Sequence, residues 1–371
     1  MIELKNGFTE RQIAAAITHR RMELTILPTE KCNFRCTYCY ETFENGRMAP
    51  HVVEGVRNLI SNRAAELEEL CFSWFGGEPL LALPVVREIL RHAKAEADQK
   101  GFRLYGGFTT NAYLLDRPLL EELVGYGQDF FQITLDGWGE QHDKTRRRAD
   151  GAGTFERIWS NLLSYRESVF DFEVQLRVHV SHENGESVRK LCHEIREAFG
   201  KDSRFNVDLQ DIRDMGGSGS ENVVPLTSAQ FDREKRALLE ILYPERAAQV
   251  DAEMAAPVKV GESAARRRSE ERGEPEPYIC YAAKPNQFLI RSTGRIGKCT
   301  VMLDDPRNDV GFLRPDGTLH LDDERLMPWF EGLTTMDVNA AGCPIHHAET
   351  LRAKGRELRD AKRIGLALAT A

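Results

Sequence analysis

The sequence predicts an α/β protein: a partial (β/α)6 barrel of the TIM type, followed by a small β-rich domain at the C-terminus. Between residues 22 and 243, six short apolar runs alternate with helical patterns, and strands separated by helices form parallel sheets. Six units are fewer than the eight that close a standard barrel, which favours an open one. From Tyr278 onward the sequence pattern changes and predicts short strands around two hairpin turns, Thr293-Gly294 and Asp316-Gly317. A doubly wound open sheet is the competing arrangement.

The expected strands cover 23–28, 71–75, 103–110, 130–135, 173–180 and 205–211. The helical patterns that alternate with them cover 51–66, 83–99, 118–126, 154–165, 186–199 and 228–242. The chain therefore divides into an N-terminal extension (1–21), the barrel (22–243), a linker or helical segment (244–277), the β-rich domain (278–347) and a C-terminal helix (348–371). The linker contains the charged run RRRSEERGEPE, which is typical of a solvated segment.

Composition and charge exclude several classes of protein. The net charge of -8 argues against a nucleic-acid partner, because phosphate binding needs a surplus of Lys and Arg. The N-terminus lacks the apolar core of a secretory signal, and no apolar run is long enough to span a membrane. We therefore expect a cytoplasmic protein, whose eight cysteines are buried thiols or metal ligands and not a disulfide framework.

Three cysteines, Cys32, Cys36 and Cys39, follow the first expected strand directly. Thiolates hold iron–sulfur clusters, and three of them within one loop can wrap a single metal centre. No fourth cysteine lies nearby, whereas a structural zinc site normally has four closed ligands. The spacing favours a cluster with one iron left open, and the alternatives are a zinc site or three unrelated buried cysteines.

The pattern C-x3-C-x2-C, with Tyr38 before the last cysteine, resembles the signature of the radical S-adenosylmethionine (SAM) superfamily. This resemblance implies a [4Fe-4S] cluster whose open iron binds the amino and carboxylate groups of SAM. It also implies that one electron from the cluster splits SAM and that the resulting 5′-deoxyadenosyl radical takes a hydrogen atom from the substrate. Tyr38 would lie near the adenine.

Two further segments are similar to motifs of this superfamily. Gly76, Gly77, Glu78 and Pro79 follow the second strand and resemble its GGEP motif, whose backbone and acid hold the SAM amino group. Read alone, the same four residues would be a turn. Asn111 follows the third strand in a segment similar to the family's TN(G), with Ala112 in place of the glycine. It would lie near SAM or cap the next helix.

The later strands supply the remaining candidates of the barrel. The segment from Thr134 to Gly137, with the residues that follow it, resembles radical SAM enzymes that carry SPASM or twitch extensions. It makes Asp136 a catalytic candidate at the active-site rim, against the alternative of a turn aspartate. The resemblance suggests that Arg177 pairs with the SAM carboxylate, which suits a bidentate guanidinium, although an ion pair inside the barrel is equally compatible. Gln210 and Asp211 end the sixth strand and are candidates to face the substrate.

The C-terminal pattern of Cys280, Cys299 and Cys343 resembles the auxiliary-cluster domain of the SPASM/twitch subfamily. A full SPASM domain uses seven cysteines for two clusters, so the resemblance implies one auxiliary [4Fe-4S] cluster here. His346 or His347 would supply a fourth ligand, or the site would stay open. The alternative is a domain that keeps the fold without the cluster. Cys71 and Cys192 fit buried small hydrophobic residues better than ligands.

The resemblance implies an enzyme that modifies a ribosomally synthesised peptide by crosslinking or epimerisation. The alternatives are radical chemistry on a small molecule or on a protein side chain, as in sulfatase maturation, and, from another class, a non-catalytic metal-binding structural protein. About twenty residues precede the first strand, too few for a leader-binding domain. We therefore expect the leader to be read by a separate protein, by the barrel edge or not at all. A flavodoxin or ferredoxin would be the electron donor.

Overall fold

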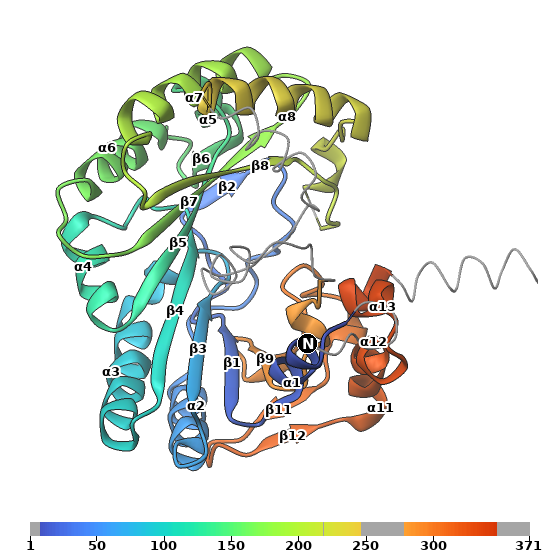
Figure 1. Ribbon diagram of the computed structural model, residues 1–371. Helices are drawn as coiled ribbons and strands as arrows, with labels where there is room; N and C mark the ends of the chain where they lie inside the picture. The colour runs from blue at the N-terminus through green and yellow to red at the C-terminus, as the bar shows by residue number, and fades with distance from the viewer. Residues whose placement is uncertain (1–7, 218, 246–277, 347–371) are drawn as a thin grey trace, which may run out of the picture.

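The computed structural model describes residues 8–217, 219–245 and 278–346. Most of the expected linker, His347 and the expected C-terminal helix lie outside the described residues. Within them, one sheet has the strand order β12-β11-β10-β9-β1-β3-β4-β5-β7-β8, and a separate two-stranded ribbon pairs β2 with β6. Figure 1 shows the larger sheet as an open curve with helices on its outside.

Six parallel strands form the barrel portion of this sheet. They are β1 (Arg21–Ile26), β3 (Glu69–Trp74), β4 (Arg103–Thr110), β5 (Gln128–Leu135), β7 (Glu173–Val180) and β8 (Phe205–Asp211), and each pairs in parallel with the next. Their order in the sheet is their order in the chain, whereas a doubly wound sheet reverses order at its centre. The predicted partial barrel is therefore confirmed, and the six expected strands lie within two residues of the observed bounds.

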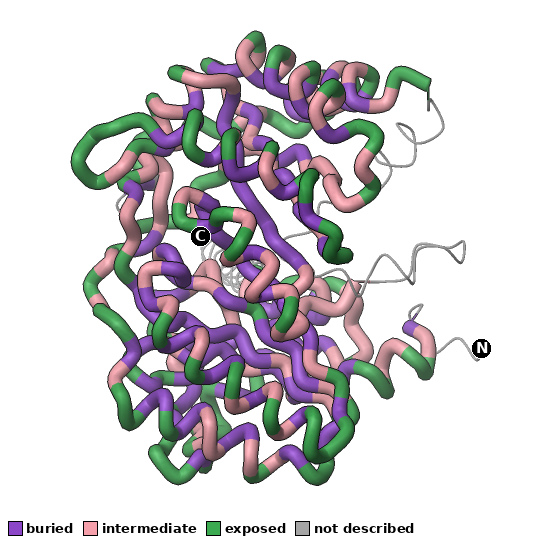
Figure 2. Tube along the Cα trace, turned by 90° about the vertical axis from the view of Figure 1, so that its left-hand side faces the viewer, coloured by how far each residue is buried: buried purple, intermediate pink, exposed green. Residues whose placement is uncertain are grey.

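The helices that connect these strands line the outer face of the curve (Figure 1). They are α2 (Pro50–Arg63), α3 (Leu83–Lys100), α4 (Arg117–Gly125), α6 (Phe155–Tyr165), α7 (Gly185–Phe199) and α8 (Ser228–Leu242). Local chemistry fixes their ends: the Asp116 side chain caps α4, and Gly101 ends α3 with a φ of 82° that favours glycine. The apolar faces of the helices and of the sheet make up one core, which Figure 2 shows as buried segments.

The core at the centre of the sheet is aromatic. Trp74, Phe108 and Phe131 occupy neighbouring strands and stack with ring centroids 5.7 and 6.0 Å apart. All three are essentially inaccessible to solvent, so their burial contributes strongly to the hydrophobic stabilisation of the sheet.

The opposite face of the last two barrel strands is polar. In β7 every second residue is fully buried, and the residues between them are only half-buried, among them Gln175, Arg177 and His179. Residues paired laterally with these on β8 are also polar, including Asp208 and Gln210. Because side chains alternate between the two faces of a strand, these polar groups line the inner face of the open barrel.

Several short elements have no counterpart in the sequence prediction. Helix α1 (Glu10–Ile17) begins with a capping box between Thr9 and Gln12. Strands β2 (Phe34–Cys36) and β6 (Arg146–Arg148) form the ribbon, α5 (Glu140–Thr145) precedes β6, and the 3₁₀ helix η2 (Pro79–Ala82) precedes α3. Each is too short to show a periodic apolar pattern.

The C-terminal strands continue the barrel sheet. They are β9 (Gln287–Ile290), β10 (Arg295–Gly297), β11 (Gly311–Leu313) and β12 (Leu319–Leu321), which pair in antiparallel fashion, while β9 pairs in parallel with β1. The two expected hairpin turns are present, with Gly294 and Gly317 at φ values of 82° and 84°. The expected small β-rich region is therefore joined to the barrel through the free edge of β1.

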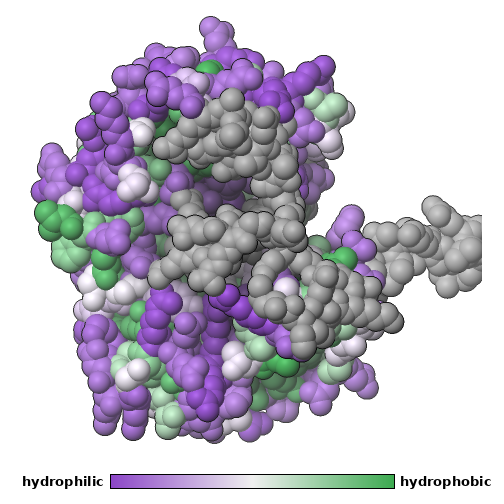
Figure 3. All heavy atoms as spheres, viewed as in Figure 1, coloured by the Kyte–Doolittle hydropathy of each residue, from purple (hydrophilic) through white to green (hydrophobic). Residues whose placement is uncertain are grey.

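Short helices complete the C-terminal region: η5 (Tyr281–Ala283), η6 (Pro306–Asn308), α11 (Asp323–Leu326), η7 (Met327–Phe330), α12 (Glu331–Thr335) and α13 (Val338–Gly342). The described surface seen in Figure 3 is largely hydrophilic, with scattered apolar patches. Among the residues that the structure describes, no helix combines the length and the apolar character needed to cross a membrane.

Candidate functional site

The loop that carries Cys32, Cys36 and Cys39 is fixed by the ribbon. Phe34 to Cys36 pair with Arg146 to Arg148, and the Thr37 amide donates to the Thr145 carbonyl at 3.0 Å. The Phe34 amide lies 3.3 Å from the Cys32 sulfur, in hydrogen-bonding geometry. The loop follows β1, so its three thiols lie at the carboxyl edge of the parallel strands, where α/β proteins bind ligands.

A buried polar network under this loop holds Tyr38. Its hydroxyl lies 2.8 and 3.0 Å from the two carboxylate oxygens of Asp136, and the Arg146 guanidinium donates to it at 2.8 Å. The Asp136 carboxylate also accepts a hydrogen bond from Thr145 at 2.6 Å and lies 3.1 Å from His179. Burial favours the neutral acid, but the hydrogen bond and charge of His179, with the charge of Arg146, outweigh it and lower the Asp136 pKa.

Asp136, the catalytic candidate predicted at the active-site rim, lies inside this network. Its side chain is fully buried, and protein groups satisfy both carboxylate oxygens. The sequence indicates a carboxylate after a strand end, but it does not show that Tyr38 and Thr145 lie against it. In this structure Asp136 positions the cysteine loop.

The three thiols fit a cluster by the chemistry of their donors. Burial raises the pKa of Cys32, Cys36 and Cys39, to about 12 for Cys39, so their thiolate forms need a cation to stabilise them. The negative charges of Cys36 and Cys39 also raise the pKa of Cys32, which places the three sulfurs in one electrostatic neighbourhood. Over the described residues, no three Cys, His, Asp or Glu side chains are already gathered around one point.

The Gly76-Gly77 turn packs against the start of the cysteine loop. A Cβ on Gly77 would lie 2.5 Å from the Lys31 carbonyl oxygen and 2.9 Å from the Cys32 nitrogen. Gly76 has a φ of 113°, and a Cβ there would lie 2.4 Å from the Thr29 carbonyl oxygen. Only glycine permits this close approach of the two backbones.

Glu78 and Pro79 continue this turn into the interior. The fully buried Glu78 carboxylate accepts hydrogen bonds from the Leu80 amide, the Asn111 amide and the Thr110 hydroxyl, at 2.8 to 3.0 Å. Burial raises its pKa to about 6, although these donors act in the opposite direction. The sequence predicts that this carboxylate binds the SAM amino group. In the structure, the same carboxylate already accepts hydrogen bonds that join two loops of the protein. Pro79 is buried at the start of η2.

Asn111 lies beside the first cysteine. Its side-chain nitrogen donates to the Asn33 side chain at 2.8 Å and lies 3.9 Å from the Cys32 sulfur. Its side-chain oxygen accepts from the Tyr113 amide at 3.1 Å. The next residue, Ala112, has a φ of 58°, a conformation that suits the glycine of the usual motif better.

Arg177 makes the in-barrel ion pair that the sequence left as an alternative. Its guanidinium lies 3.1 Å from the Asp208 carboxylate on the neighbouring strand, and Gln210 donates to the same carboxylate at 2.7 Å. Asp211 pairs with Arg213 at 2.8 Å, away from this group. Arg177 and Gln210 therefore belong to the polar inner wall of the barrel.

The second set of cysteines is assembled by tertiary contacts. The Cys280 amide donates to the Ala341 carbonyl at 2.8 Å, which draws the end of α13, and with it Cys343, towards Cys280. The Cys299 amide donates to the side chain of the buried Asn308 at 2.9 Å. Burial raises the pKa of Cys280 to about 11, and the charges of Cys299 and Cys343 act in the same direction, so the three thiols are within electrostatic range of one another.

Tyr281 and Lys298 flank Cys280 and Cys299 in this second set. The Tyr281 hydroxyl lies 3.9 Å from the Cys299 sulfur and 2.8 Å from the Thr300 hydroxyl. The fully buried Lys298 ammonium donates to the carbonyls of Lys284 and Gln287, and burial lowers its pKa to about 7. Cys343 and the candidate ligand His346 are exposed, and His347 lies outside the described residues.

Comparison with known families identifies the barrel. Residues 26–195, which contain the first cysteine set and the strands β3 to β7, match the family model of the radical SAM superfamily. The chain contains a radical SAM domain. The family predicted from the cysteine spacing is thereby confirmed.

Relatives of known role match parts of this chain. The cysteine-type anaerobic sulfatase-maturating enzyme of Clostridium perfringens is 25% identical over 219 residues, which are 57% of this chain and 58% of that enzyme. The PqqA peptide cyclase of Gluconobacter oxydans is 32% identical over 114 residues, which are 31% of this chain and 30% of the cyclase. The chain thus spans less than two thirds of the length of these relatives.

Solved structures show the fold over more of the chain. Native anSMEcpe with bound AdoMet and Kp18Cys peptide superposes with a TM-score of 0.58 and 18% identity, over 84% of each chain. Streptococcus suis SuiB bound to the precursor peptide SuiA superposes with a TM-score of 0.56 and 17% identity, over 87% of this chain and 70% of SuiB. At these identities the likeness extends to the fold alone.

Tyr40 follows Cys39 and is electrostatically coupled to both cysteine sets. Burial raises its pKa well above the ordinary value, and the charges of Glu41, Cys39 and Cys299 raise it further, while Arg177 acts in the opposite direction. One side chain is therefore within electrostatic range of the first cysteine set, the second set and the inner wall. Sequence reasoning missed it, although its place directly after Cys39 was a signal.

An ion pair also joins the two regions. The Arg291 guanidinium at the end of β9 donates to the Glu30 carboxylate at 2.5 and 3.2 Å, and Asn45 and Ser292 donate to the same carboxylate. Burial opposes ionisation of Glu30, but these hydrogen bonds and the charge of Arg291 lower its pKa. The pair ties the loop after β1 to the segment that leads to Cys299.

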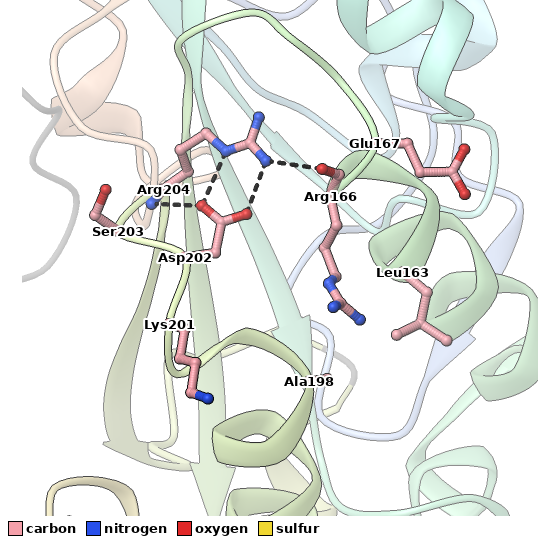
Figure 4. Close-up of a pocket in the computed structure, with 8 residues that line it drawn as sticks. All are labelled: Leu163, Arg166, Glu167, Ala198, Lys201, Asp202, Ser203 and Arg204. Carbon is pink, nitrogen blue, oxygen red and sulfur yellow. Dashed lines mark hydrogen bonds and ion pairs between the residues drawn. The ribbon is translucent and has the colours of Figure 1, made fainter.

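A surface groove at the other end of the barrel is not part of this site. Its lining residues are Leu163, Arg166, Glu167, Ala198, Lys201, Asp202, Ser203 and Arg204 (Figure 4). They lie at the ends of α6 and α7 and before β8. Because the strands are parallel, this is the end opposite the cysteine loop. Arg204 pairs with Asp202 at 2.7 Å and donates to the carbonyls of Ser168 and Arg166, which ties the loops together.

Proposed function

We propose that this protein is a radical SAM enzyme that modifies a polypeptide substrate. The observation that carries this proposal is the loop of three cysteines, fixed by the β2–β6 ribbon at the carboxyl edge of an open barrel whose inner wall is polar. The match of residues 26–195 to the radical SAM family gives that loop its chemistry.

In this proposal Cys32, Cys36 and Cys39 hold a [4Fe-4S] cluster and leave one iron for SAM. The cluster, when bound, supplies the electron that converts SAM into a hydrogen-abstracting 5′-deoxyadenosyl radical. The protein's own part is to hold the geometry. The ribbon and the Tyr38–Asp136 network fix the loop, so the ligands need little reorganisation when the cofactors bind.

Other residues orient SAM. The close packing of Gly76 and Gly77 brings backbone groups next to the cysteine loop, and Asn111 presents a side-chain amide beside Cys32. Arg177 supplies a cation on the inner wall, where its pair with Asp208 aims the guanidinium. Tyr38 contributes the aromatic position of the loop next to the adenine.

A polypeptide substrate is supported by the relatives. Those named above include a sulfatase-maturating enzyme, a peptide cyclase and SuiB, which was solved with a precursor peptide. Within the described residues the sheet does not close between β8 and β12, which is compatible with a substrate as large as a polypeptide. Crosslinking or epimerisation of a ribosomal peptide is the form we propose. Modification of a protein side chain is the second candidate, supported by the match to the C. perfringens enzyme.

We assign an auxiliary [4Fe-4S] cluster to Cys280, Cys299 and Cys343. Three thiols from separate segments lie within electrostatic range of one another, which supports this role. The proposal also includes a flavodoxin or ferredoxin as electron donor, a separate leader-binding protein and a reducing, cytoplasmic location in which the thiols stay free.

Anaerobic purification tests the proposed function. We expect brown protein that contains iron and sulfide and that forms 5′-deoxyadenosine from SAM when a reductant is added. Colourless protein with stoichiometric zinc and no 5′-deoxyadenosine would instead identify a structural metal-binding protein.

A further inference from the structure

Glu41 is a buried acid, and one of its two carboxyl oxygens has no hydrogen-bond partner among the described residues. The residue is 8% exposed, and its Oε2 atom is buried without a hydrogen bond from any residue that the structure describes. Glu78, the comparable buried acid of the barrel, is satisfied by three donor groups. Burying a carboxyl group without a donor costs free energy, and folded proteins retain few such groups unless they serve a ligand.

The described charged groups around Glu41 do not supply that donor. Glu30, Arg291 and Asp304 are its charged neighbours. The Arg291 guanidinium is engaged by Glu30, by the Leu303 carbonyl at 2.5 Å and by Asp304 at 3.6 Å. Two carboxylates therefore occupy the Arg291 guanidinium, and Glu41 adds a third acidic group within electrostatic range of it. Asp304 is 53% exposed, so the corner is open towards solvent on that side.

The missing partner fits an organic cation better than a metal ion. A metal ion needs several oxygen ligands around one point, and no such group of three occurs in the described part of the chain. An ammonium or guanidinium group needs only one or two acceptors and brings its own N–H donors. Such a group would donate a hydrogen bond to the Glu41 carboxyl group and would balance the excess of acidic groups with a positive charge.

We propose that Glu41, with Asp304 at its entrance, binds a lysine or arginine side chain of the polypeptide substrate. This inference rests on the proposed function and names the chemistry that the site selects. Glu41 lies two residues after Cys39, and the charge of its carboxyl group acts on Cys39 and Tyr40. A basic residue anchored there holds the neighbouring part of the peptide beside the cysteine loop, where the radical is generated.

The test compares two blocked tripeptides, acetyl-Ala-Lys-Ala-amide and acetyl-Ala-norleucine-Ala-amide, which differ in the terminal ammonium group. Their binding to cluster-loaded, SAM-bound protein is measured by calorimetry and by the change in the EPR spectrum of the reduced cluster. We expect the lysine peptide to bind about tenfold more tightly than the norleucine peptide. In Glu41→Gln this preference disappears, and in Glu41→Asp it is partly kept, since an acidic group remains.

Glu44→Gln is the matched control, because Glu44 lies three residues further along and is exposed. This variant should keep the preference for lysine. Equal binding of the two peptides by the wild type, no detectable binding of either at about 10 mM, or a preference that persists in Glu41→Gln overturns the inference. If the purified protein carries no cluster, the proposed function is refuted. Calorimetric titration of that protein with the two tripeptides would still decide the role of Glu41.

Discussion

The two cysteine sets of this protein are built in different ways. Cys32, Cys36 and Cys39 lie in one loop, and their positions are set locally by a ribbon and by Tyr38. Cys280, Cys299 and Cys343 come from three segments, and the Ala341 carbonyl and the Asn308 side chain bring these segments together. The first set is therefore fixed by sequence spacing, whereas the second exists only once the C-terminal region has folded.

The largest expected effect is the loss of the first set. In Cys36→Ala only two thiolates remain in the loop, which cannot hold a cluster with one open iron, so SAM cleavage should be abolished. Formation of 5′-deoxyadenosine under anaerobic, reducing conditions measures it. Retained cleavage would show that the loop does not carry the reactive centre.

The second set should be separable from the first. Cys299→Ala should lose about half of the iron, since two clusters become one, while SAM cleavage in the absence of substrate largely remains. Iron and sulfide analysis gives the first quantity and product analysis the second. Unchanged iron would mean that the C-terminal region holds no cluster.

The Tyr38–Asp136 network under the first cysteine set predicts that the stability of the protein depends on pH. Since the Asp136 pKa is lowered by folding, its contribution to stability is present above the unfolded pKa of about 4 and is lost as the pH falls towards the lower folded value. Asp136→Asn should lower the free energy of unfolding by about 3 kcal/mol at neutral pH, because His179 and Arg146 lose their buried counter-charge. Denaturant unfolding of the wild type and the variant, at neutral pH and below pH ~4, measures the difference in stability under both conditions. A difference that does not shrink in acid would contradict this account of Asp136.

A smaller effect is expected from the support of the second set. Asn308→Ala removes side-chain hydrogen bonds to the amides of Lys298 and Cys299 and to the carbonyls of Cys299 and Met302. The variant should lose about 2 kcal/mol of stability and part of the iron of the second set, with the first set unaffected. Thermal unfolding and iron analysis test this, and a variant with full iron content would show that Asn308 does not position Cys299.

The sequence predicted what depends on local pattern. The six β/α units, the hairpin turns at Gly294 and Gly317 and the radical SAM family all follow from periodicity, turn chemistry and cysteine spacing. The ribbon between β2 and β6 could not be predicted, because strands of three residues carry no periodic signal. Nor could the pairing of β9 with β1, because it joins segments far apart in the chain.

The candidate site shows the same limit. Glu78 and Asp136 stand at strand ends, where sequence indicates ligand contact, yet both carboxylates are buried and bound to protein donors. Whether a carboxylate is free depends on donors from distant segments, which spacing does not reveal. The roles of Tyr40, Glu41 and Arg291 emerge for the same reason only when the loop after β1 and the segment after β9 are seen together.

The central claim is that the loop with Cys32, Cys36 and Cys39 holds a cluster without help from the second cysteine set, and that one iron of this cluster is open to SAM. Mössbauer spectroscopy of the ⁵⁷Fe-labelled variant Cys280→Ala/Cys299→Ala/Cys343→Ala, with and without SAM, tests it most directly. The account predicts a single [4Fe-4S] cluster in which one of the four irons changes its signal when SAM is added. A variant without a cluster, or a spectrum that SAM leaves unchanged, would contradict it.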